Sequence, residues 1–219
     1  MNKQGKGGDR SLAARVLHTA RALNPAGLNR GAAGNVSARC DQGFLITPSG
    51  MAWDACTEAD MVLLDGQGAV IGGERRASSE WRFHRDIYAA RPQTGAVIHC
   101  HAPFAVALAC QKLEIPPFHY MIARFGGDSV RCADYAVFGS QRLSDAILVA
   151  LKERNACLMA HHGMTVTGDN LEHALELAIE LEALCEQYWR VLQLGAAQLL
   201  TAEQMSEVME RFSDYGKQH

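Results

Sequence analysis

The spacing of apolar and polar residues along the chain predicts helices interleaved with short strands. Residues 11–23 place Leu12, Val16 and Leu23 on one apolar stripe, and the stripe ends at the helix breakers Pro25 and Gly27. Asn170 and Thr201 are suited to cap two helices near the carboxyl end. The further predicted helices cover residues 78–91, 103–111, 141–153, 170–194 and 201–212.

Short runs of β-forming residues lie between these helices. Those in the first third of the chain cover residues 34–39, 44–47, 61–64 and 69–71, and two buried strands are expected at 96–101 and 156–160. No repeat or linker interrupts the pattern. We therefore expect one α/β domain over residues 11–219 with a mixed or mainly antiparallel sheet, preceded by a polar, glycine-rich and flexible tail at 1–10.

Composition narrows the function classes. The chain has 219 residues, 48% of them hydrophobic, and a net charge of -3, so it can form a core but carries no basic footprint for nucleic acid. It contains no apolar run of about 20 residues that could span a membrane, and its polar start does not resemble a signal peptide. The 7 cysteines are odd in number and form no C-x-x-C pair, which favours a reducing cytoplasm over a disulfide framework.

Two histidine motifs supply the strongest candidate chemistry. In a strand, His99 and His101 would share one face while Cys100 points to the other. His162 directly precedes Gly163 and is expected at a sharp turn, from which it can reach the same point, whereas His161 is the weaker candidate. Three imidazoles around an open position are typical of catalytic zinc, although other first-row divalent metals accept the same ligands.

The alternatives to this metal site are an ordinary buried histidine and a structural zinc site. A lone histidine in an apolar run is most often a core residue that satisfies its own hydrogen bonds. A structural zinc site would fill the fourth position, usually with cysteine, and Cys100 is turned the wrong way.

Glu80 is the acidic residue to add to this cluster. It lies in the first turn of a predicted helix, where a carboxylate is favoured, so it could also be a simple capping residue. His84 follows four residues later on the same helical face. We interpret His84 as a residue that packs or hydrogen-bonds in the protein rather than as a ligand.

Three short segments could bind an anion through backbone N–H groups and hydroxyls. They are Gly34–Ser37, Thr47–Gly50 and the pair Ser78-Ser79, and the last opens a helix. None matches a nucleotide-binding glycine motif. Each is unremarkable alone, and together they predict a phosphate site only if they lie beside the metal.

The order of these motifs resembles the class II aldolase/adducin family. The strings that carry the resemblance, from about Leu12 to Gly216, are GNVSAR, TPSG, SSEWRFH, HCHA, HYMIA, YAVFG, HHG and DYG. The resemblance implies a single three-layer α/β/α domain with a central, mainly antiparallel sheet. It also implies a homotetramer with zinc sites near the subunit interfaces and one zinc per subunit. The cytoplasmic location and the lack of nucleic-acid or membrane partners are expected from the composition.

The same resemblance implies reversible cleavage of a ketose 1-phosphate, with L-fuculose 1-phosphate as the first expectation, to dihydroxyacetone phosphate and lactaldehyde or another short aldehyde. By the same resemblance, Glu80 would transfer a proton and act as a displaceable metal ligand. Tyr120 would be the acid catalyst in the site of a neighbouring subunit, and Tyr215 would help to close the site over the aldehyde. The implied zinc ligands are Glu80, His99, His101 and His162. The implied phosphate-binding residues are Gly34, Asn35, Thr47, Gly50, Ser78 and Ser79.

Other activities of the family remain open from sequence. They are an aldolase for 5-deoxyribulose or ribulose 1-phosphate, an epimerase, a dehydratase or a decarboxylase of phosphorylated sugars, and an adducin-like binding module without turnover. The epimerase branch usually has aspartate where this chain has Glu80, and a binding module would have lost the histidines or the glutamate. Both observations favour an aldolase.

Overall fold

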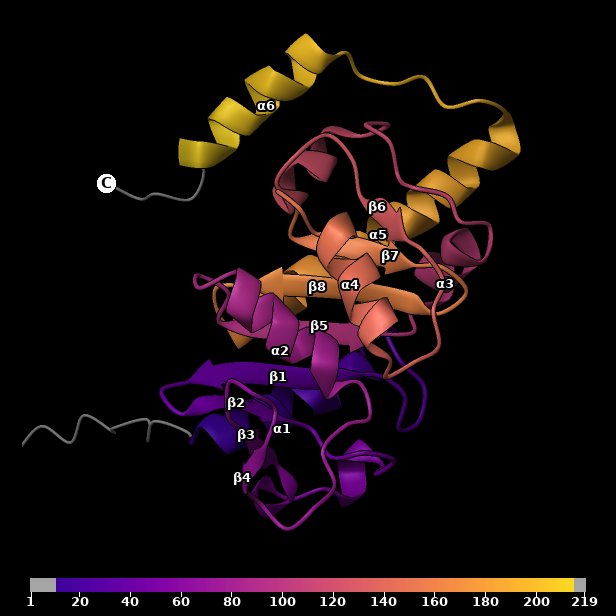
Figure 1. Ribbon diagram of the computed structural model, residues 1–219. Helices are drawn as coiled ribbons and strands as arrows, with labels where there is room; N and C mark the ends of the chain where they lie inside the picture. The colour runs from indigo at the N-terminus through magenta and orange to yellow at the C-terminus, as the bar shows by residue number, and fades with distance from the viewer. Residues whose placement is uncertain (1–10, 215–219) are drawn as a thin grey trace, which may run out of the picture.

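The computed structural model describes residues 11–214 and contains one sheet of eight strands (Figure 1). The strands are β1 (Asn35–Cys40), β2 (Gly43–Ile46), β3 (Val62–Leu64), β4 (Val70–Gly72), β5 (Ala96–Cys100), β6 (Arg131–Ala133), β7 (Ala156–Met159) and β8 (Gly163–Gly168). Their order across the sheet is β4-β3-β2-β1-β5-β8-β7-β6. Every neighbouring pair is antiparallel except β6 and β7, so the predicted mainly antiparallel sheet is confirmed.

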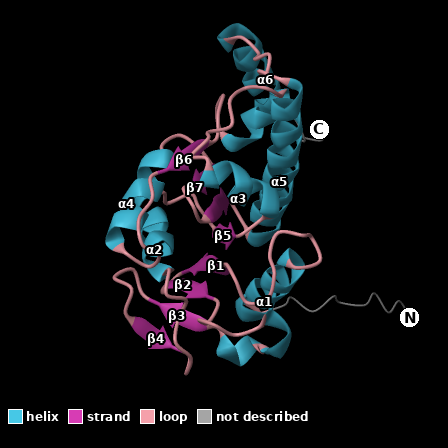
Figure 2. Ribbon diagram, turned by 90° about the vertical axis from the view of Figure 1, so that its right-hand side faces the viewer, coloured by secondary structure: helices cyan, strands magenta, loops and turns pink. Residues whose placement is uncertain are grey.

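Helices cover both faces of this sheet and produce three layers (Figure 2). The α-helices are α1 (Leu12–Leu23), α2 (Trp81–Ala90), α3 (Pro103–Cys110), α4 (Gln141–Ala150), α5 (Leu171–Leu194) and α6 (Ala202–Asp214). The short 3₁₀ turns are η1 (Trp53–Ala55), η2 (Glu58–Asp60) and η3 (Tyr120–Phe125). Helices α1, α3 and α5 pack on one face, and α2 and α4 pack on the other, as an α/β/α domain requires.

The central strand β5 shows how residue alternation divides the two cores. Ala96, Ile98 and Cys100 are buried with α1, α3 and α5, whereas Val97 is buried with α2 and α4. Side chains in a strand alternate with a period of two, so His99 faces the α2 side of the sheet. This strand therefore carries the first metal candidate into the layer from which Glu80 comes.

Polar caps begin several of the helices where the sequence predicted them. The Asn170 side chain accepts a hydrogen bond from the His173 backbone N–H at 2.8 Å, and Thr201 Oγ1 accepts from Gln204 at 3.2 Å. Each cap satisfies a backbone donor that has no partner inside its helix. The predicted boundaries of α5 and α6 agree with the structure to within two residues.

Two strands are absent from the sequence prediction, and two helices are predicted too long. Helix α2 covers residues 81–90 rather than 78–91, so Glu80 is its N-cap and does not lie in its first turn. Strand β8 begins at Gly163, where we expected a turn, and ends at Gly168, although its alternating threonines and apolar residues are all buried. Strand β6 has only three residues and is held by parallel pairing to β7. Helix α4 ends at Ala150 rather than residue 153, since the chain then turns and Glu153 adopts a positive φ of 58°.

Three broader expectations can be compared with the described residues. All 7 cysteines are free thiols. No helix within residues 11–214 combines the length and apolar character needed to cross a bilayer. The flexible tail expected at 1–10 lies outside the described residues.

Candidate metal centre

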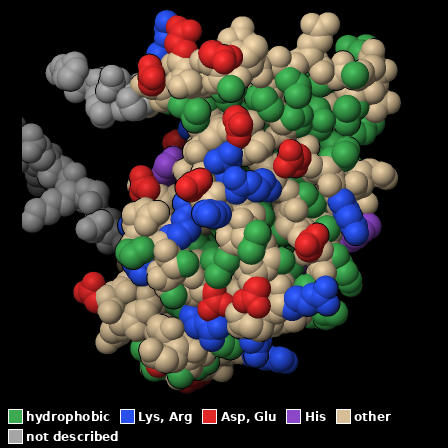
Figure 3. Space-filling view, turned by 45° about the horizontal axis from the view of Figure 1, so that its top comes forward, with side chains coloured by type: hydrophobic (Ala, Val, Ile, Leu, Met, Phe, Trp, Pro, Cys, Tyr) green, Lys and Arg blue, Asp and Glu red, His purple; other side chains and the backbone are tan. Residues whose placement is uncertain are grey.

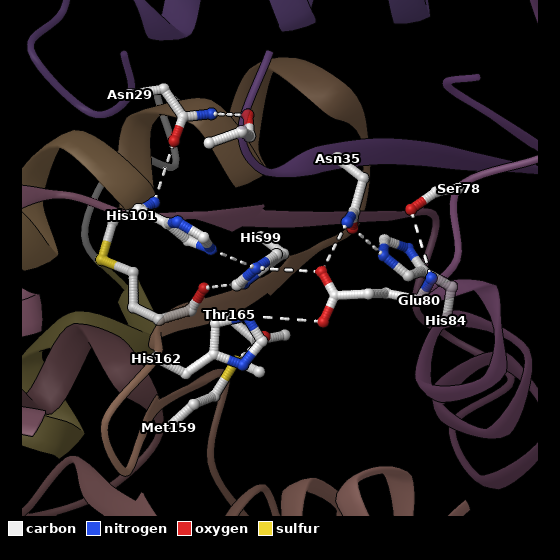
Figure 4. A network of polar contacts seen from close by, with 12 residues as sticks. Asn29, Asn35, Ser78, Glu80, His84, His99, His101, Met159, His162 and Thr165 are labelled. Carbon is white, nitrogen blue, oxygen red and sulfur yellow. Dashed lines mark hydrogen bonds and ion pairs between the residues drawn. The ribbon is translucent and has the colours of Figure 1, made fainter. Parts of the chain in front are cut away.

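His99, His101 and His162 converge on one point in the structure (Figure 4). His99 belongs to β5 and His101 follows its last residue, and their Nε2 atoms lie 3.1 Å apart. The candidate ligand atoms of all three histidines lie within 4.8 Å of one another. Tetrahedral zinc with Zn–N bonds of about 2.0–2.1 Å brings its nitrogen ligands roughly 3.3 Å apart, so only small side-chain adjustments are needed.

His162 reaches the cluster from the hairpin between β7 and β8. The turn is made by His161, whose φ is 56°, and by a hydrogen bond from the His162 N–H to the Met159 carbonyl at 3.0 Å. A Cβ on Gly163 would lie 2.5 Å from the Cys100 carbonyl oxygen, so only glycine allows this turn to approach β5. His161 points elsewhere, with its ring 6.0 Å from that of Tyr135.

Glu80 completes the cluster from the N-cap position of α2. Its Oε2 lies 3.2 Å from His99 Nε2, and its Oε1 lies 3.5 Å from His162 Nε2. The residue is only 7% exposed, yet Oε1 has no hydrogen-bond partner among the described residues. A buried carboxylate oxygen without a donor is costly, and it fits a cation held among the three histidines.

Two further groups orient the histidines. His99 Nδ1 lies 2.9 Å from the Met164 carbonyl, to which it donates, so Nε2 is directed at the cluster. The buried side chain of Asn29 accepts a hydrogen bond from the His101 backbone N–H at 2.9 Å. Sequence analysis missed Asn29 and Met164, because an asparagine in a loop and a backbone carbonyl in a strand carry no motif.

Gly34 places Asn29 and β5 in contact. Its φ is 76°, and a Cβ there would lie 2.5 Å from both Asn29 Nδ2 and the His99 carbonyl oxygen. The glycine in GNVSAR is therefore required by packing behind the histidines.

Charge coupling sets the protonation of these groups in the metal-free protein. At Glu80, burial raises the pKa, but the His99 charge and hydrogen bond outweigh it and hold the pKa at about 2. Burial lowers the pKa of His99, but Glu80 raises it more, so the net pKa lies above the ordinary value of 6.5. Burial and the charge of His99 lower the pKa of His101 and His162 to about 4.

Metal binding should consequently release a proton from His99. Because His99 is charged below its raised pKa and a metal needs the neutral ring, affinity should fall about tenfold per pH unit on the acid side of that pKa. Calorimetric titration of zinc into metal-free protein, in buffers of different ionisation enthalpy, measures the released proton. In Glu80→Gln the raising partner is gone, so this dependence should move to lower pH. An affinity that does not change from pH 6 to pH 8 in the native protein would contradict the assignment.

The three predicted anion-binding segments lie side by side. Thr47 Oγ1 accepts from the Val36 N–H at 3.2 Å, the Thr47 N–H donates to the Val36 carbonyl at 3.0 Å, and the Ser78 N–H donates to the Thr47 carbonyl at 3.1 Å. Thr47 and Ser78 are buried, whereas Gly50 is exposed and Ser79 is half-buried. Asn35 is engaged elsewhere, because its Nδ2 donates to Glu80 Oε2 at 3.0 Å.

Of the two candidate tyrosines, Tyr120 is described by the structure and is not part of the histidine cluster. Tyr120 is 50% exposed, and its ring stacks on His119 and lies 6.4 Å from that of Phe212. It lines a cavity of about 1130 Å³ between η3, α5 and α6, to which none of the three metal-site histidines contributes. Tyr215 lies outside the described residues.

A buried carboxylate and three converging imidazoles on an α/β/α sheet define a metal-dependent enzyme. The family model for the class II aldolase and adducin N-terminal domain matches residues 14–189. The chain belongs to this class II aldolase and adducin family, and it is a metal-dependent aldehyde-lyase.

Similar proteins support the assignment of the chain to this family. A 5-methylthioribulose-1-phosphate/5-deoxyribulose-1-phosphate aldolase of Rhodospirillum rubrum is 49% identical over 92% of this chain and 90% of the relative. The L-fuculose phosphate aldolase of Escherichia coli K12 is 43% identical over 94% of this chain and 95% of its own length. A solved L-fuculose 1-phosphate aldolase superposes with a TM-score of 0.90 at 33% identity, covering 95% of this chain and 100% of that one.

Proposed function

We propose that the protein reversibly cleaves a methyl- or thioether-terminated ketose 1-phosphate to dihydroxyacetone phosphate and a short aldehyde. The observation that carries the proposal is the Glu80 carboxylate, which is buried against His99 and His162 with one oxygen unpartnered. The named activities of the relatives cover L-fuculose 1-phosphate, the first expectation from sequence, and the 5-deoxyribulose and 5-methylthioribulose 1-phosphates.

We propose zinc as the metal, one ion per subunit, held by His99, His101 and His162 with Glu80 as a displaceable ligand. A bound divalent cation would act as a Lewis acid toward the oxygens on which negative charge develops. The protein's own part is to present neutral imidazoles: the pKa of His101 and His162 is already about 4. Only His99 must give up a proton.

Glu80 is proposed to carry the proton on the phosphate-bearing fragment. The carboxylate lies beside the metal-site histidines, and its Oε1, which has no hydrogen-bond partner among the described residues, is free to accept a proton. In the cleavage direction, Glu80 would deliver this proton to the carbon atom of the phosphate-bearing fragment whose carbon–carbon bond has broken. In the condensation direction, Glu80 would remove the proton from that carbon.

The phosphate is proposed to bind where Gly34, Asn35, Thr47, Gly50, Ser78 and Ser79 gather. The hydroxyls of Thr47 and Ser78 accept backbone N–H bonds, so each still has its own hydrogen to donate to an anion. Helix α2 begins at Trp81, immediately after this segment, and its amino end favours negative charge.

Tyr120 and Tyr215 are proposed to act in the site of a neighbouring subunit in a cytoplasmic homotetramer. The half-exposed ring of Tyr120 stacks on His119 and Phe212 and not on any of the three metal-site histidines of its own chain, which supports a role in another copy. There Tyr120 would donate a proton to the aldehyde oxygen in condensation and recover it in cleavage. Tyr215 would help close the site.

The aldehyde end is proposed to contact the loop of residues 134–139. Its apolar side chains Tyr135, Val137 and Phe138 are 53%, 60% and 66% exposed. The two ends of the loop lie beside the segments that carry the site, since Tyr135 contacts His161, the neighbour of His162, and Gly139 packs against Ser79, the neighbour of Glu80. An apolar wall suits a terminal methyl or methylthio group better than a hydroxyl.

A panel of ketose 1-phosphates tests the proposal. Zinc-loaded protein should cleave L-fuculose, 5-deoxyribulose and 5-methylthioribulose 1-phosphates to dihydroxyacetone phosphate and lactaldehyde, acetaldehyde and methylthioacetaldehyde. Ribulose 1-phosphate, which ends in a hydroxyl, should have a lower kcat/KM. Absence of dihydroxyacetone phosphate from every substrate would refute the proposal.

Phe138→Ala should reduce the preference for the methyl-terminated substrates. Losing the apolar contact to one methyl group costs about 1–3 kcal/mol, so the ratio of kcat/KM for 5-deoxyribulose over ribulose 1-phosphate should fall roughly tenfold. Val149→Ala, on the exposed surface of α4, is the control and should leave the ratio unchanged. An unaltered ratio in Phe138→Ala would place the aldehyde elsewhere.

A further inference from the structure

A line of hydrogen-bonded side chains leads from Glu80 into the protein on the side away from the metal-site histidines, and Figure 4 shows its first links, from Glu80 through Asn35 to His84. Beyond Glu80, its members are Asn35, His84, Ser37 and Tyr88, and each is at most 5% exposed. The first two links join Glu80 Oε2 to Asn35 Nδ2 at 3.0 Å and Asn35 Oδ1 to His84 Nε2 at 2.5 Å. The next two join His84 Nδ1 to Ser37 Oγ at 2.6 Å and Ser37 Oγ to Tyr88 Oη at 2.8 Å.

The side chains of this hydrogen-bonded line come from strand β1 and helix α2, at positions that share one face of each element. Asn35 and Ser37 are two residues apart on β1 and share a face. His84 and Tyr88 are four residues apart on α2, in the same row as Glu80 at its N-cap. The side chains therefore interleave where the helix crosses the strand.

The chemistry of each group fixes the direction of every hydrogen bond. A carboxylate only accepts, so Asn35 must present Nδ2 to Glu80 and Oδ1 to His84. His84 Nε2 must then donate. Burial, with a further contribution from the charge of His99, lowers the pKa of His84 to about 3, so the neutral ring has a single N–H. Its Nδ1 accepts from the Ser37 hydroxyl, whose oxygen accepts from Tyr88.

We propose that His84 is a positioning residue: its Nε2–H, held in that tautomer by Ser37, fixes the Asn35 amide so that Nδ2 faces Glu80 and aims the carboxylate at the metal centre. This assignment goes beyond the metal ligands and rests on the proposed role of Glu80 for its kinetic consequence.

The Asn35 side chain needs a fixed orientation because its amide can turn end over end. Both ends of an amide have the same size, and without a donor at its far side Asn35 could turn its carbonyl toward Glu80. That orientation would set two acceptors against each other in a buried site. With Oε2 held by Asn35, the unpartnered Oε1 points toward His162 at 3.5 Å.

Nuclear magnetic resonance tests the tautomer without any substrate. Long-range ¹H–¹⁵N spectra of zinc-loaded protein labelled at histidine should show His84 as a neutral ring with hydrogen on Nε2 from pH 6 to pH 9. The His84 signal is assigned by its loss in His84→Gln. An Nδ1–H tautomer, or a ring that becomes charged in this range, would overturn the proposal.

Two variants of His84 separate positioning from packing. The Gln amide in His84→Gln can place a donor near the site of Nε2, whereas Asn in His84→Asn reaches only Ser37 and leaves Asn35 without its donor. We expect kcat to fall about 10- to 100-fold in His84→Asn with KM changed less than about threefold, and His84→Gln to recover most of that loss. Because Asn is also smaller than Gln, His84→Leu is the packing control: it fills the space of the ring but donates no hydrogen bond, and it should lose as much kcat as His84→Asn. Near-native kcat in His84→Leu, or equal losses in His84→Asn and His84→Gln, would overturn the proposal.

Two serines supply a second matched comparison. Ser37 and Ser144 are both fully buried and each bonds a side chain of α2, Ser37 to His84 and Ser144 to Asp86 at 2.6 Å. Ser37→Ala should let His84 populate the other tautomer and should lower kcat several-fold. Ser144→Ala should change neither the tautomer population of His84 nor kcat. If Ser37→Ala keeps the native tautomer population, Ser37 does not hold it and the proposal fails.

The spectra and the kinetics also distinguish this proposal from the proposed function. If no ketose 1-phosphate is cleaved, the proposed function fails, while the tautomer in the native protein and in Ser37→Ala still decides the hydrogen-bond chain. If cleavage occurs and the tautomer is the opposite one, only the positioning role fails.

Discussion

Glu80→Gln should lower the rate of ketose 1-phosphate cleavage by on the order of 10³-fold while most of the bound metal remains. Gln cannot take a proton, but it has nearly the same shape and can still accept from Asn35 Nδ2. The three histidines are unchanged, so metal content measured by elemental analysis should stay near one per chain. Exchange of the dihydroxyacetone phosphate proton with solvent, followed by nuclear magnetic resonance, should disappear.

The proton exchange separates a base from a ligand. If Glu80 only held the metal, exchange would continue at the rate expected for the metal that remains. Glu186→Gln is a suitable control, because Glu186 pairs with Arg190 on the surface of α5. It should behave as the native protein does. Native-rate exchange in Glu80→Gln would reject the proton-transfer role.

Removal of one metal-site histidine should have an effect of similar size through a different cause. His101→Ala leaves two imidazoles, and the metal content should fall well below one per chain. Cleavage should drop at least about 10³-fold because the metal supplies most of the charge stabilisation. Chelation of the native protein should give the same loss, and added zinc should restore activity in the native protein only.

Two controls show whether the loss of activity in His101→Ala comes from the missing metal ligand or from a general folding defect. His18→Ala changes an exposed histidine on α1 and should alter neither metal content nor activity. Thermal unfolding of His101→Ala should show that the domain still folds, since its two cores do not depend on the metal. Full activity in a preparation shown to be metal-free would exclude the proposed mechanism.

The sequence was informative where local periodicity carries the signal. Alternation along residues 96–101 correctly separated His99 from Cys100, which lies in the opposite core. The interpretation of His84 as a hydrogen-bonded residue is also confirmed, since both ring nitrogens have partners. The roles assigned to Glu80, Tyr120, Tyr215 and the phosphate-binding residues remain predictions.

The sequence was less informative where a residue acts through contacts with distant segments. Asn29 meets His101 across 72 positions, and Ser37 meets His84 across 47. Asn29 belongs to none of the motifs that we identified, and Ser37 belongs to a segment that we had assigned to anion binding and not to the support of a histidine. Strand β8 was hidden for a related reason, because its glycines suit close packing as well as turns.

By itself, then, the sequence determined the helices and six of the eight strands, the two histidine motifs and the acid nearest to them, because each depends on neighbours a few positions away. Only the tertiary structure decided that β5, the β7–β8 hairpin and the start of α2 meet at one point, and that a hydrogen-bonded chain supports Glu80 from behind. The reason is physical: strand order and the crossing of α2 over β1 arise from burying both faces of the sheet, and spacing along the chain does not encode them.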